Sequence, residues 1–271
     1  MINSTNATTS HGPAACPVCG SAAAFTFRSL YVDVGKCKSA ACGHLHALSA
    51  AAADGVQTHP AANAEAAVYA ERNLRLVSYW RARGFLFDGA KVLDIGAGAG
   101  HIDSAMAAAV PGLKISCVEA DLDSCDSLLA RGFECHARLD LCNDRFNAIL
   151  LVEVIEHIAD PVPFLKLCAD RLMPGGRVFL STPCGETSKE WRRTNAYSTR
   201  EHVQFFTEKS LGLACQRAGL SLLGYEAAPL YPRRAGVAGV LDGMKHALFP
   251  LRDLVRGRMH LISFLQASAN L

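Results

Sequence analysis

The stretch that most constrains the fold of this chain is KVLDIGAGAGHIDS, at residues 91–104. The apolar run at its start is typical of a buried strand, and three glycines spaced by two follow it. Glycine has no side chain, so a turn built from such residues lets the backbone approach a ligand closely. The stretch therefore predicts a strand, a ligand-binding turn and a helix in succession.

The spacing of the glycines separates two classes of cofactor. A dinucleotide site needs G-x-G-x-x-G, with the pyrophosphate at the helix N-terminus. The third place is taken by His101 in the frame that starts at Gly96, and by Asp103 in the frame that starts at Gly98. Asp94 at the end of the strand would repel a pyrophosphate, but it suits a ligand with an amino group and a sulfonium. The loop therefore favours S-adenosylmethionine.

The rest of the chain alternates between helix-like and strand-like patterns. A helical period runs from Glu65 to Arg83. Further helices are expected at 101–110, 122–131, 161–172 and 207–218. Strands are expected at 91–95, 113–118, 133–137, 146–152 and 177–182, with a sixth after the last helix and a seventh in RMHLISFLQ. This alternation predicts an α/β fold, with a parallel sheet covered by helices on both faces.

Six stretches, in order and correctly spaced, resemble the class I (Rossmann-like) S-adenosylmethionine-dependent methyltransferases over residues 65–226. They are VLDIGAGAG, CVEAD, LDL at 139–141, VEVIEHIADP, LMPGGRVFLSTP and EHVQFFTEKSLGLACQRAGLSLLGYE. The resemblance implies a Rossmann-like seven-stranded sheet that ends in an antiparallel seventh strand. It also implies an enzyme that takes a methyl group from S-adenosylmethionine and leaves S-adenosylhomocysteine as product.

The same resemblance assigns the cofactor site. Glu119 falls where the family's acid holds the two ribose hydroxyls, and a carboxylate can accept both of those hydrogen bonds. Asp140 and Leu141 fall where relatives hold the adenine, and a solvated loop acid is the alternative for Asp140. The implied cofactor-binding residues are Asp94, Gly96, Ala97, Gly98, Gly100, Glu119, Ala120, Asp140, Leu141, Val152 and Glu153.

The chain departs from the family's usual residues at two informative positions. Asn147 stands where relatives commonly have an Asp that caps the start of the fourth strand. Cys184 stands where relatives often have Asn, at a position that overlooks the substrate pocket. The second departure leaves the identity of the substrate open.

Histidines supply the candidate base, because a hydroxyl acceptor must lose a proton and the histidine pKa suits that task near neutral pH. His157 follows Glu156 at the mouth of the fourth strand, and His202 lies in REHVQFF. The catalytic candidates are therefore His157, His202 and Glu156. A structural hydrogen bond is the alternative for either histidine, and a divalent ion held by Glu153, Glu156 and His157 is another. The asparagine-proline-proline-aromatic tetrapeptide of amino-methylating enzymes is missing, which favours oxygen as the acceptor atom.

Two cysteine pairs near the N-terminus, CPVCG and CKSAAC, have the spacing C-x2-C-x17-C-x4-C. Two such knuckles can present four thiolates to a structural zinc ion, and about thirty residues without a large core need a metal of this kind. The predicted ligands are Cys16, Cys19, Cys37 and Cys42. His44 or His46 could replace one thiolate, and a redox pair or unbound thiols are the alternatives to zinc. Phe25, Phe27 and Tyr31 are expected to form the small core of this zinc ribbon.

These features divide the chain into a disordered tail at 1–15, a zinc ribbon at 16–48, a linker at 49–64 and a methyltransferase domain at 65–271. Residues 228–256 are expected to form a helical insertion that caps the substrate pocket. The alternatives for this insertion are a surface that meets a membrane or a lipid-linked acceptor, and a packing or dimer helix. A homodimer is one option among oligomeric states that the sequence leaves open.

Composition restricts the location and the partners of the protein. No apolar run reaches the length of about 18 residues that spans a bilayer, and the N-terminus lacks the order of a signal peptide. Eleven cysteines without an export signal indicate reduced thiols or a metal site in the cytoplasm. Most of the seven cysteines outside the two pairs are expected to be small buried hydrophobic residues. A formal net charge of +2 argues against nucleic acid as the main partner.

The resulting hypothesis is an S-adenosylmethionine-dependent methyltransferase that acts on a small molecule or a glycan, at oxygen and with a histidine base. One alternative is an RNA methyltransferase that uses the zinc ribbon to bind RNA. The other is a non-catalytic scaffold that binds the cofactor.

Overall fold

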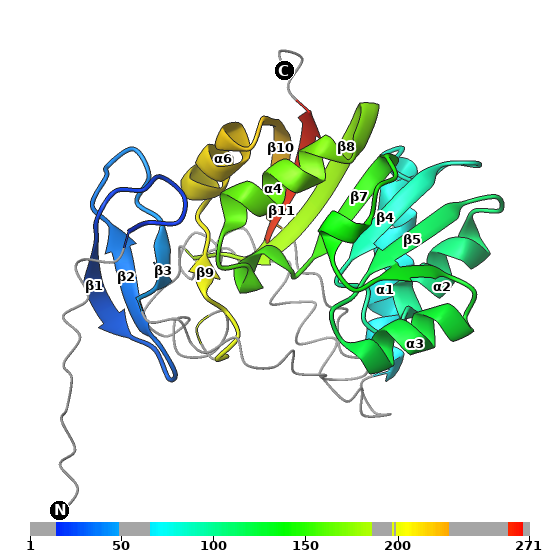
Figure 1. Ribbon diagram of the computed structural model, residues 1–271, viewed down its shortest axis with the longest axis horizontal. Helices are drawn as coiled ribbons and strands as arrows, with labels where there is room; N and C mark the ends of the chain where they lie inside the picture. The colour runs from blue at the N-terminus through cyan, green and yellow to red at the C-terminus, as the bar shows by residue number, and fades with distance from the viewer. Residues whose placement is uncertain (1–14, 49–65, 186–196, 198, 228–259, 268–271) are drawn as a thin grey trace, which may run out of the picture.

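The computed structural model describes residues 15–48, 66–185, 197, 199–227 and 260–267 (Figure 1). Nearly all of the predicted tail, the linker at 49–64 and the insertion at 228–256 lie outside these residues. The described strands form two sheets, one of seven strands and one of four. No helix in the described ranges is long and apolar enough to cross a membrane.

The larger sheet has the strand order β10-β11-β8-β7-β4-β5-β6. Its strands are β4 (Lys91–Ile95), β5 (Lys114–Val118), β6 (Glu134–His136), β7 (Phe146–Val152), β8 (Leu172–Pro183), β10 (Leu220–Ala227) and β11 (His260–Ala267). The five strands from β4 to β8 pair in parallel, and β11 is antiparallel to both of its neighbours. The predicted seven-stranded Rossmann-like sheet with an antiparallel seventh strand is confirmed.

Helices cover both faces of this sheet (Figure 1). They are α1 (Ala66–Ala82), α2 (His101–Ala109), α3 (Leu122–Ala130), α4 (Pro161–Asp170) and α6 (Glu208–Arg217), with short 3-10 turns η1 (Leu139–Leu141) and η2 (Ile155–His157). On β7, Ala148 and Leu150 pack with α1 and α2, whereas Ile149 and Leu151 pack with α4 and α6. Both faces are buried, which explains why β7 is a continuous apolar run.

The expected strand at 177–182 is longer than the sequence indicated, because β8 begins at Leu172 and includes the LMPGG turn. Phe146 pairs with Leu172, and the register shifts before Ala148 pairs with Arg177. A Cβ on Gly176 would lie 2.8 Å from the carbonyl oxygen of Phe146, so this irregular pairing requires glycine.

The smaller sheet has the order β1-β2-β3-β9, and all its pairs are antiparallel. Its strands are β1 (Ala23–Arg28), β2 (Asp33–Cys37), β3 (Leu45–Ala47) and β9 (Gln204–Phe205). The first three belong to the N-terminal segment, defined here as residues 15–48. The fourth comes from the connection between β8 and α6, so the later chain completes the sheet of the N-terminal segment (Figure 1).

The core of the smaller sheet differs from the one that the sequence suggested. Phe25 and Tyr31 are 61% and 46% exposed, so they are not core residues as expected. The buried cluster instead combines Val32 and Val34 of the N-terminal segment with Tyr197 and Phe205 of the later chain, and Phe27 packs against it. The Tyr197 and Phe205 rings stack with their centroids 4.3 Å apart. Aromatic residues far along the chain therefore replace the local ones.

Cys125 of α3 and Cys135 of β6 form a disulfide, with Cα atoms 5.8 Å apart. The expectation of reduced, separately buried thiols is wrong for these two, because the short turn after α3 folds β6 back beside the helix. The other five cysteines outside the pairs are buried as expected, and none of them is in a disulfide: Cys117, Cys142, Cys168, Cys184 and Cys215.

Candidate active site

The glycine turn lies between the end of β4 and the start of α2, at the carboxyl edge of the parallel strands. Gly96, Gly98 and Gly100 have φ values of 76°, 55° and 76°, which are left-handed conformations that favour glycine. A Cβ on Gly96 would lie 2.7 Å from the Val154 side chain, so close packing demands glycine there. A Cβ on Gly98 would have no heavy atom within 4 Å, so this residue borders open space in which a ligand can approach the backbone.

The Glu119 carboxylate joins the glycine turn to the next strand. Its Oε2 accepts a hydrogen bond of 2.8 Å from the Gly98 amide, and its Oε1 accepts one of 2.9 Å from the Asp121 amide. Glu119 is 8% exposed. Each carboxylate oxygen has a second lone pair, so both oxygens retain the capacity to accept from a vicinal diol.

Asp94 is the fourth residue of β4, two residues before Gly96, and is almost completely buried. Burial, and then the nearby carboxyls of Asp103 and Glu119, raise its pKa well above the ordinary value. A cation that approaches this group would find little competing solvent. The two predicted carboxyl groups therefore lie at the ends of two neighbouring strands, beside the glycine turn.

The residues predicted for the adenine lie on η1 and are exposed. The Asp140 carboxylate accepts two hydrogen bonds from the Arg138 guanidinium, at 2.9 and 2.6 Å. The Arg138 hydrogen bonds lower the pKa of Asp140. Leu141 is 56% exposed and offers an apolar side chain beside it.

β7 ends at Val152, and Glu153 follows with a φ of 57°, a left-handed conformation that is rare outside glycine. Its amide donates to the Ser181 carbonyl at 3.1 Å, and the Ser181 hydroxyl donates to Glu153 Oε1 at 2.9 Å. Strained residues of this kind gather at functional sites because the surrounding structure must hold them in place. β8 therefore fixes the direction in which the chain leaves β7.

The three predicted catalytic residues come together after β7. The His157 and His202 rings meet edge to face with centroids 4.8 Å apart, and His157 Nδ1 lies 3.2 Å from the Glu201 carbonyl oxygen. Glu156 is 1% exposed and its Oε2 accepts from the Thr182 hydroxyl at 3.0 Å. Burial, and then the charge of Glu153, raise the Glu156 pKa well above the ordinary value.

One ligand atom from each of Glu156, His157 and His202 lies within 4.8 Å of the others. The grouping differs from the alternative metal set of the sequence, because His202 takes the place of Glu153. Val154, the residue before η2, lies beside Gly96, so the segment that carries His157 starts at the glycine turn.

The histidine segment is bound to the N-terminal segment through Gln204. The Gln204 side-chain amide donates to the carbonyls of Ile158 and Ala159, at 3.0 and 2.9 Å, just after η2. Its Oε1 lies 2.8 Å from His44 Nε2. The Val203 amide also donates to the Glu156 carbonyl at 2.8 Å. The cysteine-rich part of the chain thus reaches the backbone that carries the catalytic candidates.

The four paired cysteines form one cluster in which all sulfurs lie within 4.8 Å of one another. The Sγ atoms of Cys16 and Cys42 are 3.8 Å apart, and those of Cys19 and Cys37 are 3.4 Å apart. A tetrahedral site with Zn–S bonds of about 2.3 Å places its sulfurs about 3.8 Å apart, so the donor set fits zinc. His44 is outside this set, because its ring nitrogens contact Gln204 and Ser210.

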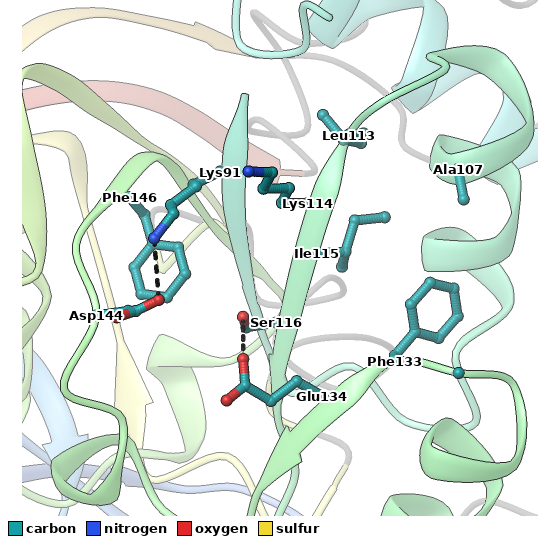
Figure 2. Close-up of a pocket in the computed structure, with 11 residues that line it drawn as sticks. Lys91, Ala107, Leu113, Lys114, Ile115, Ser116, Phe133, Glu134, Asp144 and Phe146 are labelled. Atoms are coloured by element: carbon teal, nitrogen blue, oxygen red, sulfur yellow. Dashed lines mark hydrogen bonds and ion pairs between the residues drawn. The ribbon is translucent and has the colours of Figure 1, made fainter. Parts of the chain in front are cut away.

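A pocket of about 530 Å³ lies elsewhere, at the amino ends of β4 and β5 (Figure 2). Lys91, the first residue of β4, forms an ion pair of 3.1 Å with Asp144 across it, and the Ser116 hydroxyl donates to Glu134. The lining contains none of the predicted site residues, and it is at the opposite end of the strands from the glycine turn. In parallel sheets of this kind, ligands bind at the carboxyl ends.

Three residues that contribute to the site are not among the predicted site residues. Asp103 interrupts the dinucleotide pattern in the sequence, and in the structure its side chain is completely buried near Asp94. Gln204 and Thr182 bond to the segment around η2 from elements distant in sequence. For Asp103, a useful signal was its place among Ile102 and Met106 on the buried side of α2.

Asn147 caps the start of a strand, which is the role that the resemblance assigned to the family's Asp at this position. Its Oδ1 accepts a hydrogen bond of 2.9 Å from the Lys91 amide, at the start of β4. The substitution therefore keeps a cap at the amino ends of the strands and leaves the cofactor edge unaffected.

Comparison with known proteins agrees with this geometry. A family described as "Methyltransferase domain" matches residues 65–224. Similar proteins include the ubiquinone biosynthesis O-methyltransferase of Chromobacterium violaceum, which is 31% identical over 159 residues, and that of Xanthomonas campestris pv. campestris, which is 33% identical over 105 residues. These matches cover 49% and 35% of this chain, and 66% and 43% of the relatives. The chain thus spans less than two thirds of the curated relatives it matches.

The fold is also found among solved structures. An S-adenosylmethionine-dependent methyltransferase from Clostridium acetobutylicum aligns with a TM-score of 0.52 and 10% identity, over 76% of this chain and 95% of that one. At this identity the likeness shows the fold alone. The family match, in contrast, covers more than half of the chain and includes the glycine turn and the histidine segment. The chain belongs to the class I, Rossmann-like S-adenosylmethionine-dependent methyltransferases.

Proposed function

We propose that this enzyme methylates a hydroxyl group of a small molecule or a glycan, with one of the two paired histidines as the base. The observation that carries the proposal is the contact between His157 and His202, on a segment whose preceding residue, Val154, lies beside Gly96 of the glycine turn. The O-methyltransferases among its relatives agree with an oxygen acceptor. We also propose that the protein is located in the cytoplasm.

The glycine turn fits the cofactor on two grounds. Gly98 borders open space, and carboxyl groups suited to a cationic amino group and to a diol lie on either side of it. When bound, S-adenosylmethionine supplies a methyl group that its sulfonium activates for transfer. The residues proposed to hold it are Asp94, Gly96, Ala97, Gly98, Gly100, Glu119, Ala120, Asp140, Leu141, Val152 and Glu153.

The histidine pair is proposed to move the acceptor's proton. A protonated Nδ1 of His157 that donates to the Glu201 carbonyl leaves the lone pair on Nε2, the nitrogen that can then accept a proton. His202 contacts the same ring and is the second candidate. A positive charge on either ring favours ionisation of the buried Glu156 carboxyl, so this group would stabilise the protonated base.

We also infer that Cys16, Cys19, Cys37 and Cys42 bind one structural zinc ion. Four sulfurs complete a tetrahedral shell, so such a site has no open position for catalysis. The proposed task of this metal is to hold the turns on which His44 and β3 depend.

Isothermal titration calorimetry with S-adenosylhomocysteine tests the cofactor site. The purified, cofactor-free protein is expected to bind it, and Asp94→Ala and Glu119→Ala are expected to weaken binding by at least tenfold. Asp144→Ala is the matched control, since it removes an exposed carboxylate at the opposite end of the strands. Absence of binding by the unmodified protein, or unchanged affinity in both site variants, would overturn the proposal.

Transfer of a radiolabelled methyl group to a panel of phenols, catechols and sugars tests the acceptor. Mass spectrometry of the product then locates the new bond at oxygen, nitrogen or carbon. A product methylated at nitrogen or carbon contradicts the oxygen acceptor without affecting the cofactor site. Methylated RNA as the main product would favour the RNA methyltransferase alternative.

A further inference from the structure

Gln204, the first residue of β9, is 4% exposed, and both polar atoms of its side chain have partners. Its amide nitrogen donates to the carbonyl oxygens of Ile158 and Ala159, at 3.0 and 2.9 Å, so both of its hydrogens are used. Its oxygen lies 2.8 Å from His44 Nε2. These partners fix the orientation of the amide group, because the reverse orientation would set its oxygen against two carbonyl oxygens.

The bonds of Gln204 lie next to the histidine pair. The two carbonyl groups that it holds follow His157 directly in the chain, and Gln204 itself is two residues after His202. The Val203 amide adds a bond of 2.8 Å to the Glu156 carbonyl, just before His157. Hydrogen bonds on both sides of His157 therefore set the separation of the two segments whose rings meet with centroids 4.8 Å apart.

The N-terminal segment determines where Gln204 lies. β3 pairs with β9, with His46 opposite Gln204 (Figure 1). His44 supplies a second connection: because the Gln204 oxygen faces it, His44 must donate from Nε2, and its Nδ1 contacts the Ser210 hydroxyl at 3.2 Å. The His44 carbonyl accepts from the Cys37 amide at 2.8 Å, and Cys37 belongs to the cysteine cluster. A continuous series of contacts thus runs from the cluster to the histidine pair.

The segment that Gln204 holds lies at the surface. His157 and Ala159 are exposed, and Ile158 is only half-buried. Segments with little burial open easily, so the shape of this one depends on its hydrogen bonds more than on packing. Displacement of a catalytic group by about 1 Å can lower a rate by about 10²-fold. The bonds of Gln204 are therefore placed where they affect the geometry of the base.

We propose that Gln204 is a positioning residue for the histidine pair, and that the N-terminal segment controls methyl transfer through it. This role presupposes the proposed function, because it requires His157 or His202 as the base. Gln204 keeps the two rings in contact and so keeps the lone pair of the base in one direction. Its side-chain bonds reach His44 and the backbone after η2, and not the glycine turn, so cofactor binding should be independent of it.

The first test is an NMR measurement that needs no acceptor. Protein with isotope-labelled histidine should give a through-space cross-peak between the His157 and His202 rings, whose resonances are assigned with the alanine variant of each. Gln204→Glu has nearly the same shape but sets an oxygen against the two carbonyls. In this variant the cross-peak should be lost, while S-adenosylhomocysteine should bind with unchanged Kd.

Ser210→Ala is the matched control for this test. It removes a buried hydroxyl group from the other nitrogen of His44 and also removes the capping box of α6, so it lowers stability without altering the bonds of Gln204. The cross-peak should remain in this variant. A loss caused by general destabilisation would appear in both variants.

Kinetics provide the second test, with the acceptor that the methylation panel identifies. Gln204→Glu should lower kcat by about tenfold or more and leave the KM for S-adenosylmethionine unchanged. His44→Gln still places an amide donor near the Gln204 oxygen and should keep most of the kcat. His44→Leu has no donor and should lower kcat as Gln204→Glu does. A merely structural role would give the two His44 variants the same kcat.

Hydrogen exchange in the unmodified protein provides a measurement that needs no variant. The side-chain amide hydrogens of Gln204 should exchange with solvent far more slowly than those of Gln216, an exposed glutamine of α6. Equal exchange of the two, or a retained cross-peak and full kcat in folded Gln204→Glu, would overturn the inference and leave the proposed function intact. Absence of the cross-peak from the unmodified protein would instead overturn the histidine pair of the proposed function.

Discussion

His44 Nε2 lies 2.8 Å from the side-chain oxygen of Gln204, although 160 residues separate the two in the chain. Both side chains are buried. Gln204 is in β9 and also bonds to the backbone after η2, so a single side chain connects the cysteine-rich turns with the segment of the histidine pair. The N-terminal segment is therefore part of the same folded unit as the candidate acceptor site.

The first prediction concerns this connection. His44→Ala should destabilise the protein by about 1–3 kcal/mol, because it leaves the buried oxygen of Gln204 without its donor. Thermal unfolding followed by circular dichroism measures the effect. Lys38→Ala, which removes an exposed side chain of the same segment, should leave the unfolding temperature unchanged. Equal shifts in both variants would show that the hydrogen bond contributes nothing specific.

The second prediction concerns the metal. Mass spectrometry should find about one zinc ion per chain, and Cys37→Ser should lose it, since three thiolates bind zinc far less tightly than four. Removal of the metal with a chelator should speed hydrogen exchange in β9 as well as in β1 to β3. Cys168→Ser is the matched control, because it changes a buried thiol outside the cluster and should keep the zinc. Zinc retained by Cys37→Ser would contradict the assignment.

The third prediction separates backbone strain from cofactor approach. Gly98 and Gly132 have φ values of 55° and 87°, and neither would bring a Cβ within 4 Å of another atom. Alanine at either position should cost about 1–2 kcal/mol of stability through its left-handed conformation. Only Gly98→Ala should also abolish binding of S-adenosylhomocysteine, measured by calorimetry. Similar affinities in the two variants would place the cofactor elsewhere.

The fourth prediction distinguishes the base from the cofactor site. His157→Ala and His202→Ala should both bind S-adenosylhomocysteine with unchanged affinity. The variant that lacks the base should transfer methyl groups about 10²–10⁴ times more slowly, because general base catalysis contributes that much. The other should show a smaller effect, since its ring only contacts the base. Full turnover in both variants would rule out a histidine base.

The fifth prediction concerns the bond between Cys125 and Cys135. Cys125→Ser should lower stability by about 2–4 kcal/mol under oxidising conditions, because the bond restricts the unfolded chain. In the presence of a reductant, the variant and the unmodified protein should unfold at nearly the same temperature. Peptide mapping without reduction should recover the two cysteines linked. Recovery of both as free thiols from the oxidised protein would be the contrary result.

The sequence predicted the parallel sheet and the glycine turn because both are local patterns. The apolar runs of β4 and β7 indicate buried strands without knowledge of the neighbouring elements. The spacing of the glycines likewise indicates a turn with left-handed backbone conformations. The clustering of Cys16, Cys19, Cys37 and Cys42 was also predictable, because the short spacing within each cysteine pair limits how far apart its two sulfurs can lie. The candidate base was predictable from its place after a strand, since the carboxyl ends of parallel strands meet at one edge.

The remainder depends on contacts between distant parts of the chain. β9 has two residues, so it has no period to detect, and it exists only because β3 offers an edge. Phe25 and Tyr31 were mistaken for core residues because the sequence does not show that Tyr197 and Phe205 fill that space. In the sequence Asp103 resembles any acid in the first turn of a helix, and only the structure shows that its side chain is completely buried. Burial of polar groups is a property of the assembled fold.

The completion of the smaller sheet by β9 has a consequence for synthesis on the ribosome. β1, β2 and β3 emerge first, but the strand that covers their edge is made about 160 residues later. During that interval the edge of β3 and the apolar face at Val34 remain open to solvent and to other nascent chains. The N-terminal segment therefore reaches its final packing only after β9 has been synthesised.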